Sequence, residues 1–363
     1  MFRAGHELKT SQRILITRLD RIGDVVLSSP VFQALRQSFP QAWIAALVRN
    51  QTKEVVDGNP FIDEVIAYNK EGKQHSAWET IVFARGLRRK KFDTVINLHP
   101  THRAHWISFL AGIPARIGYQ KKSGWLLTHS IEDTKKEGLK HEAEYNFDLL
   151  RFLNVKVPSQ PELFFPVTEK NRVAFEKCCQ ELGFEPYREP YAVLNPSASC
   201  PSKIWSAERF AKVGDELWER YRLRSVLIGS EADSRISEKV KSLMKQNPVD
   251  LTGKLTLGML GACLKEARLL VSNDSGPVHI GVAVGTSVLS VFGRNQAGLS
   301  AKRWGPLGNR SSYVQKDVGC YFCLAHRCQI HFLCLEALRV DEVLDAIGKL
   351  ERFFLPTSSV SVL

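Results

Sequence analysis

The sequence predicts an α/β protein made of two doubly wound domains, and three observations support this. Short β-branched apolar runs alternate with amphipathic segments, as a parallel sheet covered by helices requires. A proline-bearing stretch at residues 157–166 breaks the alternation, which then resumes. The chain of 363 residues is longer than one hydrophobic core usually accommodates. We therefore expect domains over residues 1–165 and 166–345, followed by a helix end and tail over 346–363.

The first domain shows the alternation clearly. Apolar runs predict strands over residues 13–18, 43–48, 64–68 and 94–98. Helical spacing of apolar residues predicts helices over 30–39 and 78–89. Ser29 suits the N-cap of the earlier helix, Pro30 its first position, and Pro40 its end.

The second domain repeats the pattern. Strands are predicted over 191–195, 225–229, 268–272 and 288–292, and helices over 169–182, 207–221 and 257–266. After the strand at 268–272, the turn from Asp274 to Pro277 opens another helix. Asp274 and Ser275 suit cap positions, and Gly276 lets a ligand approach the backbone. A helix start at the carboxyl edge of a parallel sheet is an anion site, although an ordinary strand–turn–helix connection has the same appearance.

Charge favours anionic partners. The sequence has 50 Lys+Arg against 38 Asp+Glu, a net charge of +12. Nucleic acid is the weakest candidate, because the basic residues are neither clustered in a tail nor interleaved with aromatic residues. The polar start over residues 1–12 does not resemble a signal peptide, and no apolar run reaches membrane-spanning length, so we expect a cytosolic protein.

Loops after predicted strands carry the candidate chemistry. Residues 19–24 contain neither a dinucleotide-binding glycine motif nor a P-loop, which argues against a dehydrogenase or an ATPase. Asp24 could accept a proton from a substrate hydroxyl, or could simply cap a helix. Ser197, Ser199 and Lys203 could approach phosphate groups, and Glu231 could bind a ribose hydroxyl. Each is also explained as part of an ordinary solvated loop.

Four cysteines form a C-x2-C-x4-C-x5-C cluster: Cys320, Cys323, Cys328 and Cys334. They could hold a structural zinc, but their spacing differs from paired zinc knuckles, so reduced thiols or a disulfide are the favoured alternatives. No Asp-x-Asp metal motif is visible elsewhere.

Several motifs together resemble one family. They are Arg18–Asp24 with Ser29-Pro30, Asn195–Ser199 with Lys203 and Trp205, Leu251-Thr-Gly253, and Asn273–His279. In this order they resemble the ADP-heptose:lipopolysaccharide heptosyltransferases of glycosyltransferase family 9, over nearly the whole chain.

The resemblance implies a GT-B fold, in which two Rossmann-like domains face a central cleft that closes for reaction. It implies inverting, metal-independent transfer of heptose from ADP-heptose, with no cofactor, to the inner core of lipopolysaccharide at the cytoplasmic face of the inner membrane. From the matching motifs, the resemblance implies that Asp24 is the base and that Lys203 contacts phosphate. Asp274, Ser275 and Gly276 hold the donor beside His279, and Glu231 contacts its sugar or ribose.

An anionic lipid-linked acceptor would suit basic residues near loop edges of the first domain. The candidates, each also explained as a surface charge, are Arg18, Arg21, Arg49, Lys53, Arg103 and Arg116. His99, His102 and His105 form a further group after the strand predicted at 94–98, and one of them could contact the acceptor. Two alternatives stay open: the same fold with another donor or acceptor, and a non-catalytic nucleotide-sugar-binding protein, against which Asp24 argues.

Overall fold

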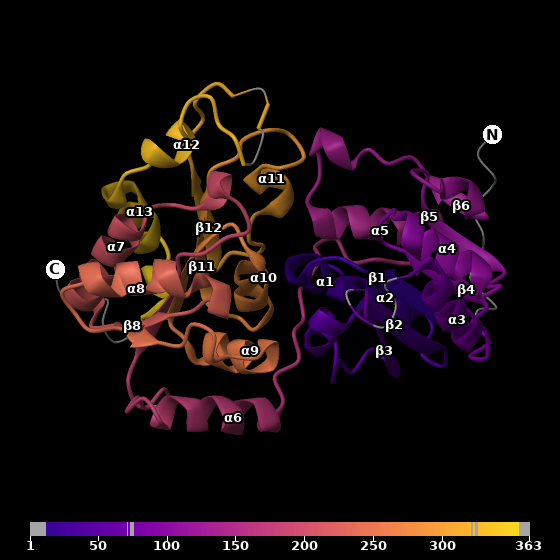
Figure 1. Ribbon diagram of the computed structural model, residues 1–363, viewed down its shortest axis with the longest axis horizontal. Coiled ribbons are helices and arrows are strands. Elements are labelled where there is room, and N and C mark those ends of the chain that lie inside the picture. The colour runs from indigo at the N-terminus through magenta and orange to yellow at the C-terminus, as the bar shows by residue number, and fades with distance from the viewer. Residues whose placement is uncertain (1–11, 71, 73–75, 321, 324–325, 356–363) are drawn as a thin grey trace. The chain divides into compact units, whose positions relative to one another are not determined.

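The computed structural model describes residues 12–70, 72, 76–320, 322–323 and 326–355, and the chain forms two compact units, Met1–Pro166 and Val167–Leu363. Figure 1 shows the first unit in indigo to magenta and the second mainly in orange to yellow, each as a sheet covered by helices. Each unit has its own apolar core. Within the described residues, no helix is both long and apolar enough to cross a membrane.

The first unit is organised around a six-stranded parallel sheet in the order β3-β2-β1-β4-β5-β6. Its strands are β1 (Arg13–Arg18), β2 (Trp43–Arg49), β3 (Glu64–Tyr68), β4 (Thr94–Asn97), β5 (Ala115–Tyr119) and β6 (His129–Ile131). Its helices are α1 (Ile22–Val26), α2 (Ser29–Ser38), α3 (Ala77–Arg88), α4 (His102–Leu110) and α5 (Glu142–Phe152). Short 3-10 turns are η2 (Asn50–Val55), η3 (Gly124–Leu126) and η4 (Lys135–Glu137).

The second unit has a six-stranded parallel sheet in the order β12-β11-β10-β7-β8-β9. Its strands are β7 (Tyr191–Asn195), β8 (Arg224–Leu227), β9 (Val249–Asp250), β10 (Leu269–Asn273), β11 (Ser287–Phe292) and β12 (Ser311–Gln315). Its helices and 3-10 turns are α6 (Glu169–Gln180), η5 (Pro201–Lys203), α7 (Ala207–Tyr221), η6 (Glu231–Asp233), α8 (Ser234–Leu243), α9 (Leu257–Glu266), α10 (Gly276–Ala283), α11 (Ala301–Trp304), α12 (Leu333–Glu336), α13 (Val340–Gly348) and α14 (Glu351–Phe354).

Both sheets have the same topology. When the strands of each unit are counted along its own sequence, both sheets read 3-2-1-4-5-6, the doubly wound order. The strand order reverses between β1 and β4 in the first unit and between β7 and β10 in the second. Loops diverge from the carboxyl edge at such a point and leave a crevice in which α/β proteins bind ligands. The fold therefore designates one candidate site in each unit.

Local sequence accounts for the elements that frame these points. The central strands β1, β7, β10 and β11 are almost wholly buried, as expected for parallel strands covered on both faces. On α7, the apolar stripe of Phe210, Val213 and Leu217 is fully buried. The predicted strands and helices are present, with ends shifted by one or two residues.

One prediction of detail differs from the structure. Ser29 is the first residue of α2 and Ser28 its N-cap, because proline is also accommodated at the second helical position. The Ser29 hydroxyl instead donates to Val26 O at 2.7 Å and accepts from Phe164 N–H at 2.8 Å, which ties the proline-bearing stretch at residues 157–166 to α2. At the other end of the chain, Phe354 packs in the core of the second unit.

Gly253 sets the backbone beside Glu231 at the carboxyl edge of the second sheet. Its φ is +74°, its N–H donates to Gly229 O at 3.0 Å, and an added Cβ would lie 3.2 Å from Glu231 Cα. Gly183 also has a positive φ, +64°, but has open space where a Cβ would project. Replacing Gly183 by alanine would therefore cost only the strained backbone conformation, whereas replacing Gly253 would add a steric clash.

We expect Gly253→Ala to lower the free energy of unfolding more than Gly183→Ala does. Both substitutions place alanine in the left-handed region, at about 1–2 kcal/mol. Only Gly253→Ala adds a clash with backbone, of about 1–3 kcal/mol by analogy with overpacking. Thermal unfolding of the two variants measures the difference, and equal losses would contradict the close packing against Glu231.

Candidate active site

A fully buried arginine organises the carboxyl end of β1. The side chain of Arg18 is 1% exposed, and its guanidinium contacts three carboxylates. Nη2 lies 2.8 Å from Asp24 Oδ1 and 3.1 Å from Glu142 Oε1, and Nε lies 3.0 Å from Asp20 Oδ2. Burial alone would lower the pKa of Arg18, but these carboxylates raise it above its usual value. Arg18 is therefore a permanent positive charge inside the unit.

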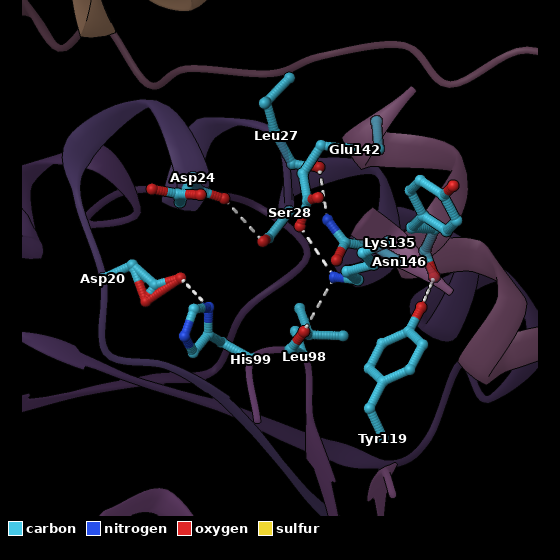
Figure 2. A network of polar contacts seen from close by, with 12 residues as sticks. Asp20, Asp24, Leu27, Ser28, Leu98, His99, Tyr119, Lys135, Glu142 and Asn146 are labelled. Carbon is cyan, nitrogen blue, oxygen red and sulfur yellow. Dashed lines mark hydrogen bonds and ion pairs between the residues drawn. The ribbon is translucent and has the colours of Figure 1, made fainter. Parts of the chain in front are cut away.

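Residues of α5 and of the segment before it complete this cluster. Asn146 accepts from Arg18 Nη1 at 3.1 Å and donates to Leu27 O at 3.0 Å. Lys135 Nζ lies 2.8 Å from Glu142 Oε1 and donates to Leu98 O at 3.3 Å. Figure 2 shows Lys135 and Asn146 gathered with Leu98, Leu27 and Glu142. These contacts fasten the loops that follow β1 and β4 to each other.

The two aspartates of the β1 loop have opposite pKa shifts. Burial opposes ionisation of Asp20, but Arg18 and a 2.6 Å contact with His99 Nδ1 lower its pKa overall. Burial raises the pKa of Asp24, and the charges of Asp20 and Glu142 add to this effect against Arg18. The side chain of Asp24 is also the most exposed of the three carboxylates, at 15% against 8% and 1%. Asp24 is therefore the carboxylate of this cluster best suited to take a proton from a bound molecule.

Figure 2 shows how these groups are presented. Asp20 and His99 lie together, from the loops after β1 and β4, and Asp24 lies nearby on α1, where Ser28 Oγ donates to its backbone carbonyl at 2.8 Å. Three carboxylates face two cations, Arg18 and Lys135. The cluster thus has a surplus of negative charge at the strand-order reversal of the first unit.

The corresponding point of the second unit has the opposite surplus. Asp274 follows β10 and is 6% exposed. Its Oδ2 lies 2.8 Å from Lys203 Nζ and 3.3 Å from Arg294 Nη2. Lys203 also donates to Asp274 O at 3.3 Å. Two cations thus face one carboxylate, next to the first turn of α10, whose backbone amides have no partners within the helix.

Asparagines hold the second-unit loops in place. Asn195 Nδ2 donates to Ser275 Oγ at 2.8 Å and to Ser272 Oγ at 3.0 Å. Asn273 Nδ2 donates to Pro196 O at 2.7 Å, and its Oδ1 accepts from Trp205 N–H at 3.1 Å. The loops after β7 and β10 are therefore bound to each other through buried side chains. Ser275 is the N-cap residue of α10 by backbone position, but its hydroxyl makes no capping bond.

The other predicted donor residues surround this point. Ser197 is buried and donates to Asn195 Oδ1 at 3.0 Å, whereas Ser199 and Glu231 are exposed at the same edge of the sheet. Gly276 begins α10, and His279 is buried on its first turn. The structure thus brings the predicted residues together along the carboxyl edges of β7, β8 and β10.

The predicted acceptor cations are less uniform. Arg21 lies on the loop after β1, Arg49 is the last residue of β2 and Lys53 lies in η2, all at the same edge as Asp24. Arg103, on the first turn of α4, donates to Tyr68 Oη at 3.0 Å. Arg18 was predicted to contact the acceptor, but it is buried among carboxylates. This placement suits it to position Asp24 instead.

Arg116 lies away from the others. It pairs in register with Val95, in the half of β5 remote from the carboxyl edge. Its guanidinium donates to the carbonyls of Leu126 and Ile113 at 2.7 and 2.6 Å. The structure therefore does not group Arg116 with Asp24.

Sequence reasoning missed several residues of both clusters. Arg294 directly follows Gly293 at the end of β11, next to β10 in the sheet, so its position after a predicted strand was an available signal. Glu142, Asn146 and Lys135 gave no local signal, because they approach Arg18 only through the fold.

The four clustered cysteines form no disulfide and are among the residues that line a cavity of about 400 Å³. Burial raises the pKa of Cys334 to about 11. Within the described part of the chain, no three His, Cys, Asp or Glu side chains are grouped as metal ligands.

Comparison with known proteins agrees with this architecture. Residues 81–333 match the sequence profile of Glycosyltransferase family 9 (heptosyltransferase). Lipopolysaccharide heptosyltransferase 3 of Escherichia coli K12 is 28% identical over 279 residues, 75% of this chain and 79% of that protein.

Solved structures have the same fold. A glycosyl transferase family 9 crystal structure from Veillonella parvula is 26% identical, with a TM-score of 0.81 over 93% of this chain and 97% of that one. The ADP-heptose lps heptosyltransferase II of Escherichia coli is 20% identical, with a TM-score of 0.75 over 93% and 98%. These matches confirm the GT-B fold expected from the sequence. Because the family profile spans more than half of the chain, the protein belongs to glycosyltransferase family 9, the heptosyltransferase family.

Proposed function

We propose that the protein is an inverting, metal-independent heptosyltransferase that transfers heptose from ADP-heptose to the inner core of lipopolysaccharide. The observation that carries this proposal is the opposite charge balance at the two strand-order reversals. The first unit presents a carboxylate with a raised pKa, and the second presents two cations and a helix N-terminus. An inverting transfer needs these two functions, a base for the acceptor hydroxyl and stabilisation for the departing diphosphate.

Asp24 is the proposed base. Oδ1 is held by Arg18 at 2.8 Å, which fixes the carboxylate while part of the side chain stays exposed. Its raised pKa makes it a better proton acceptor than an unperturbed aspartate, provided that it is ionised at the working pH. Arg18, Glu142 and Asn146 act as positioning residues through their contacts with Asp24 or with each other.

Lys203 and Arg294 are the proposed receivers of the negative charge that develops on the leaving nucleotide. Both are largely buried, so their charges are screened less than surface charges would be. The amides of α10 add the positive end of a helix dipole. Together these groups could supply the stabilisation for which other glycosyltransferases use a divalent ion. Ser197, Ser199, Glu231, Ser275, Gly276 and His279 are the proposed further donor contacts.

Donor and acceptor are proposed from the relatives. One solved structure of the same fold is named for ADP-heptose and lipopolysaccharide, and the related Escherichia coli protein is named a lipopolysaccharide heptosyltransferase. The positive residues Arg21, Arg49, Lys53 and Arg103 at the carboxyl edge of the first unit suit an anionic acceptor. We place the reaction at the cytoplasmic face of the inner membrane, with the protein bound peripherally.

A donor screen tests the function. Purified protein should be stabilised against heating by ADP-heptose more than by UDP- or GDP-sugars, because a ligand that binds only the folded state raises the unfolding temperature. It should transfer heptose to heptose-deficient lipopolysaccharide with inverted anomeric configuration, and a chelator should leave the rate unchanged. Transfer from a UDP- or GDP-sugar would reassign the donor, and loss of activity in chelator would contradict metal independence.

Asp24→Asn should leave ADP-heptose affinity nearly unchanged and lower the transfer rate by about 10²–10⁴-fold, the usual contribution of a general base. Asp57→Asn is the matched control, because Asp57 is 57% exposed on the nearby turn and pairs only loosely with Lys53, at 3.7 Å. Equal loss of binding and transfer in Asp24→Asn would indicate a structural aspartate.

The same assignment predicts a pH profile. kcat/KM should fall as the pH drops through the raised pKa of Asp24, because protonation removes the base. Asp20→Asn should move this acidic limb to lower pH, since it removes a negative charge that raises the pKa of Asp24 and frees Arg18 to interact more strongly with it. An unmoved limb in a folded Asp20→Asn variant would exclude Asp24 as the titrating group.

Lys203→Ala should weaken ADP binding by roughly 10–100-fold, as expected for loss of a charged hydrogen bond of about 1.5–3 kcal/mol. Lys212→Ala is its control, because Lys212 is exposed on α7. Isothermal titration with ADP measures both. Unchanged ADP affinity in Lys203→Ala would remove the lysine from the donor site.

A further inference from the structure

Three exposed aromatic side chains cluster on the first unit, on α4 and η3. Trp106 and Phe109 project from α4 and Trp125 from η3, with 38%, 44% and 69% of their surface exposed. The Trp106 ring meets the other two edge-to-face, with centroids 5.8 Å from Trp125 and 6.1 Å from Phe109. We call these three residues the aromatic cluster. Such a contiguous exposed group usually marks an interaction surface.

The cluster sits on a rigid support. His102 Nδ1 lies 2.7 Å from Ser123 Oγ, which joins the start of α4 to the segment that enters η3. Arg116 Nε donates to Leu126 O at 2.7 Å, which joins η3 to β5. Ile107 and Ser108, between the two aromatic residues of α4, are fully buried. The aromatic side chains are therefore presented on a fixed backbone, which reduces the conformational entropy lost on binding.

Positive charge surrounds the cluster. No Asp or Glu occurs anywhere in residues 94–131, the segment that contains all three aromatic residues. The Arg116 guanidinium lies 5.6 Å from the centre of the Phe109 ring. The Arg88 side chain lies beside Gly112, just beyond α4, and Lys122 is exposed just before η3. The surface thus combines amphipathic aromatic rings with cations from three separate elements.

We propose that the aromatic cluster and its surrounding cations dock the protein on an anionic lipid bilayer. Tryptophan side chains favour the interfacial region of a bilayer, and Lys and Arg near them are attracted to anionic headgroups. A second copy of the chain is a poorer partner, because pairing this surface with itself would bring like charges together. The proposal depends on the proposed function only in explaining why the enzyme visits a membrane, since a lipid-linked acceptor lies there.

Sedimentation of the full-length protein with lipid vesicles tests the proposal, without donor or acceptor. Protein should bind vesicles of phosphatidylethanolamine with phosphatidylglycerol, and should bind phosphatidylcholine vesicles much less. Trp106→Ala/Trp125→Ala should reduce the partition about tenfold or more, from the lost burial of apolar surface. Arg88→Glu and Lys122→Glu should each reduce it about fivefold or more, the equivalent of one basic residue near an anionic surface, and high salt should do the same.

Trp43→Ala is the matched control, because Trp43 is 39% exposed, close to the value for Trp106, but lies outside the aromatic cluster at the start of β2. Trp125→Ala alone changes the most exposed of the three aromatic residues, so it tests the proposal even if the double variant misfolds. All variants should keep the wild-type unfolding temperature and their transfer rate on a delipidated, soluble acceptor. That rate reports the proposed function separately from membrane docking.

Two results would overturn the proposal. One is vesicle binding that is indifferent to lipid charge and to loss of the tryptophans. The other is self-association without lipid, seen by analytical ultracentrifugation and abolished by Trp106→Ala/Trp125→Ala, which would make the surface a contact between copies of the chain.

Discussion

The first unit depends on one buried guanidinium. Without the charge of Arg18, three carboxylates from two distant segments could not stay ionised together in a space so poorly exposed to water. Its contacts join the loop after β1, helix α1 and helix α5, so the same interaction that permits the charges also closes the last helix of the unit onto its first strand. A buried ion cluster is a costly way to gain stability. Here the cluster determines the pKa of Asp24, the carboxylate that is most exposed to solvent.

The second unit has the same topology but the opposite charge surplus at its candidate site. Both sheets read 3-2-1-4-5-6, and both candidate sites occur where the strand order reverses. At that point the first unit has two cations against three carboxylates, and the second has two cations against one carboxylate. Since the topology is shared, the functional difference comes from a few loop residues, in accordance with the rule that sites, not folds, carry chemistry.

Sequence patterns predicted the features of the structure that depend on residues close together in the chain. The buried strands and the α7 stripe follow from short-range periodicity, and Asp24 and Lys203 were found because they follow predicted strands. Glu142 and Asn146 were not found, because more than a hundred residues separate them from Arg18 and only the fold brings them together. Arg18 itself was expected to contact an anionic acceptor; no local pattern shows that carboxylates from two distant segments will surround it.

The charge balance of the two sites also explains the direction of the proposed chemistry. When Asp24 takes a proton, two carboxylates remain against Arg18 and Lys135, so the first cluster passes from a negative surplus to neutrality. Burial raises the pKa of Asp24 and the charges of Asp20 and Glu142 raise it further, so proton uptake relieves repulsion that the resting cluster already contains. Arg18 and His99 instead lower the pKa of Asp20, against its burial. In the second unit, the positive surplus of Lys203 and Arg294 over Asp274 is reduced as negative charge develops on a leaving diphosphate. Each site is thus electrostatically unbalanced at rest, and the proposed transfer brings both closer to balance.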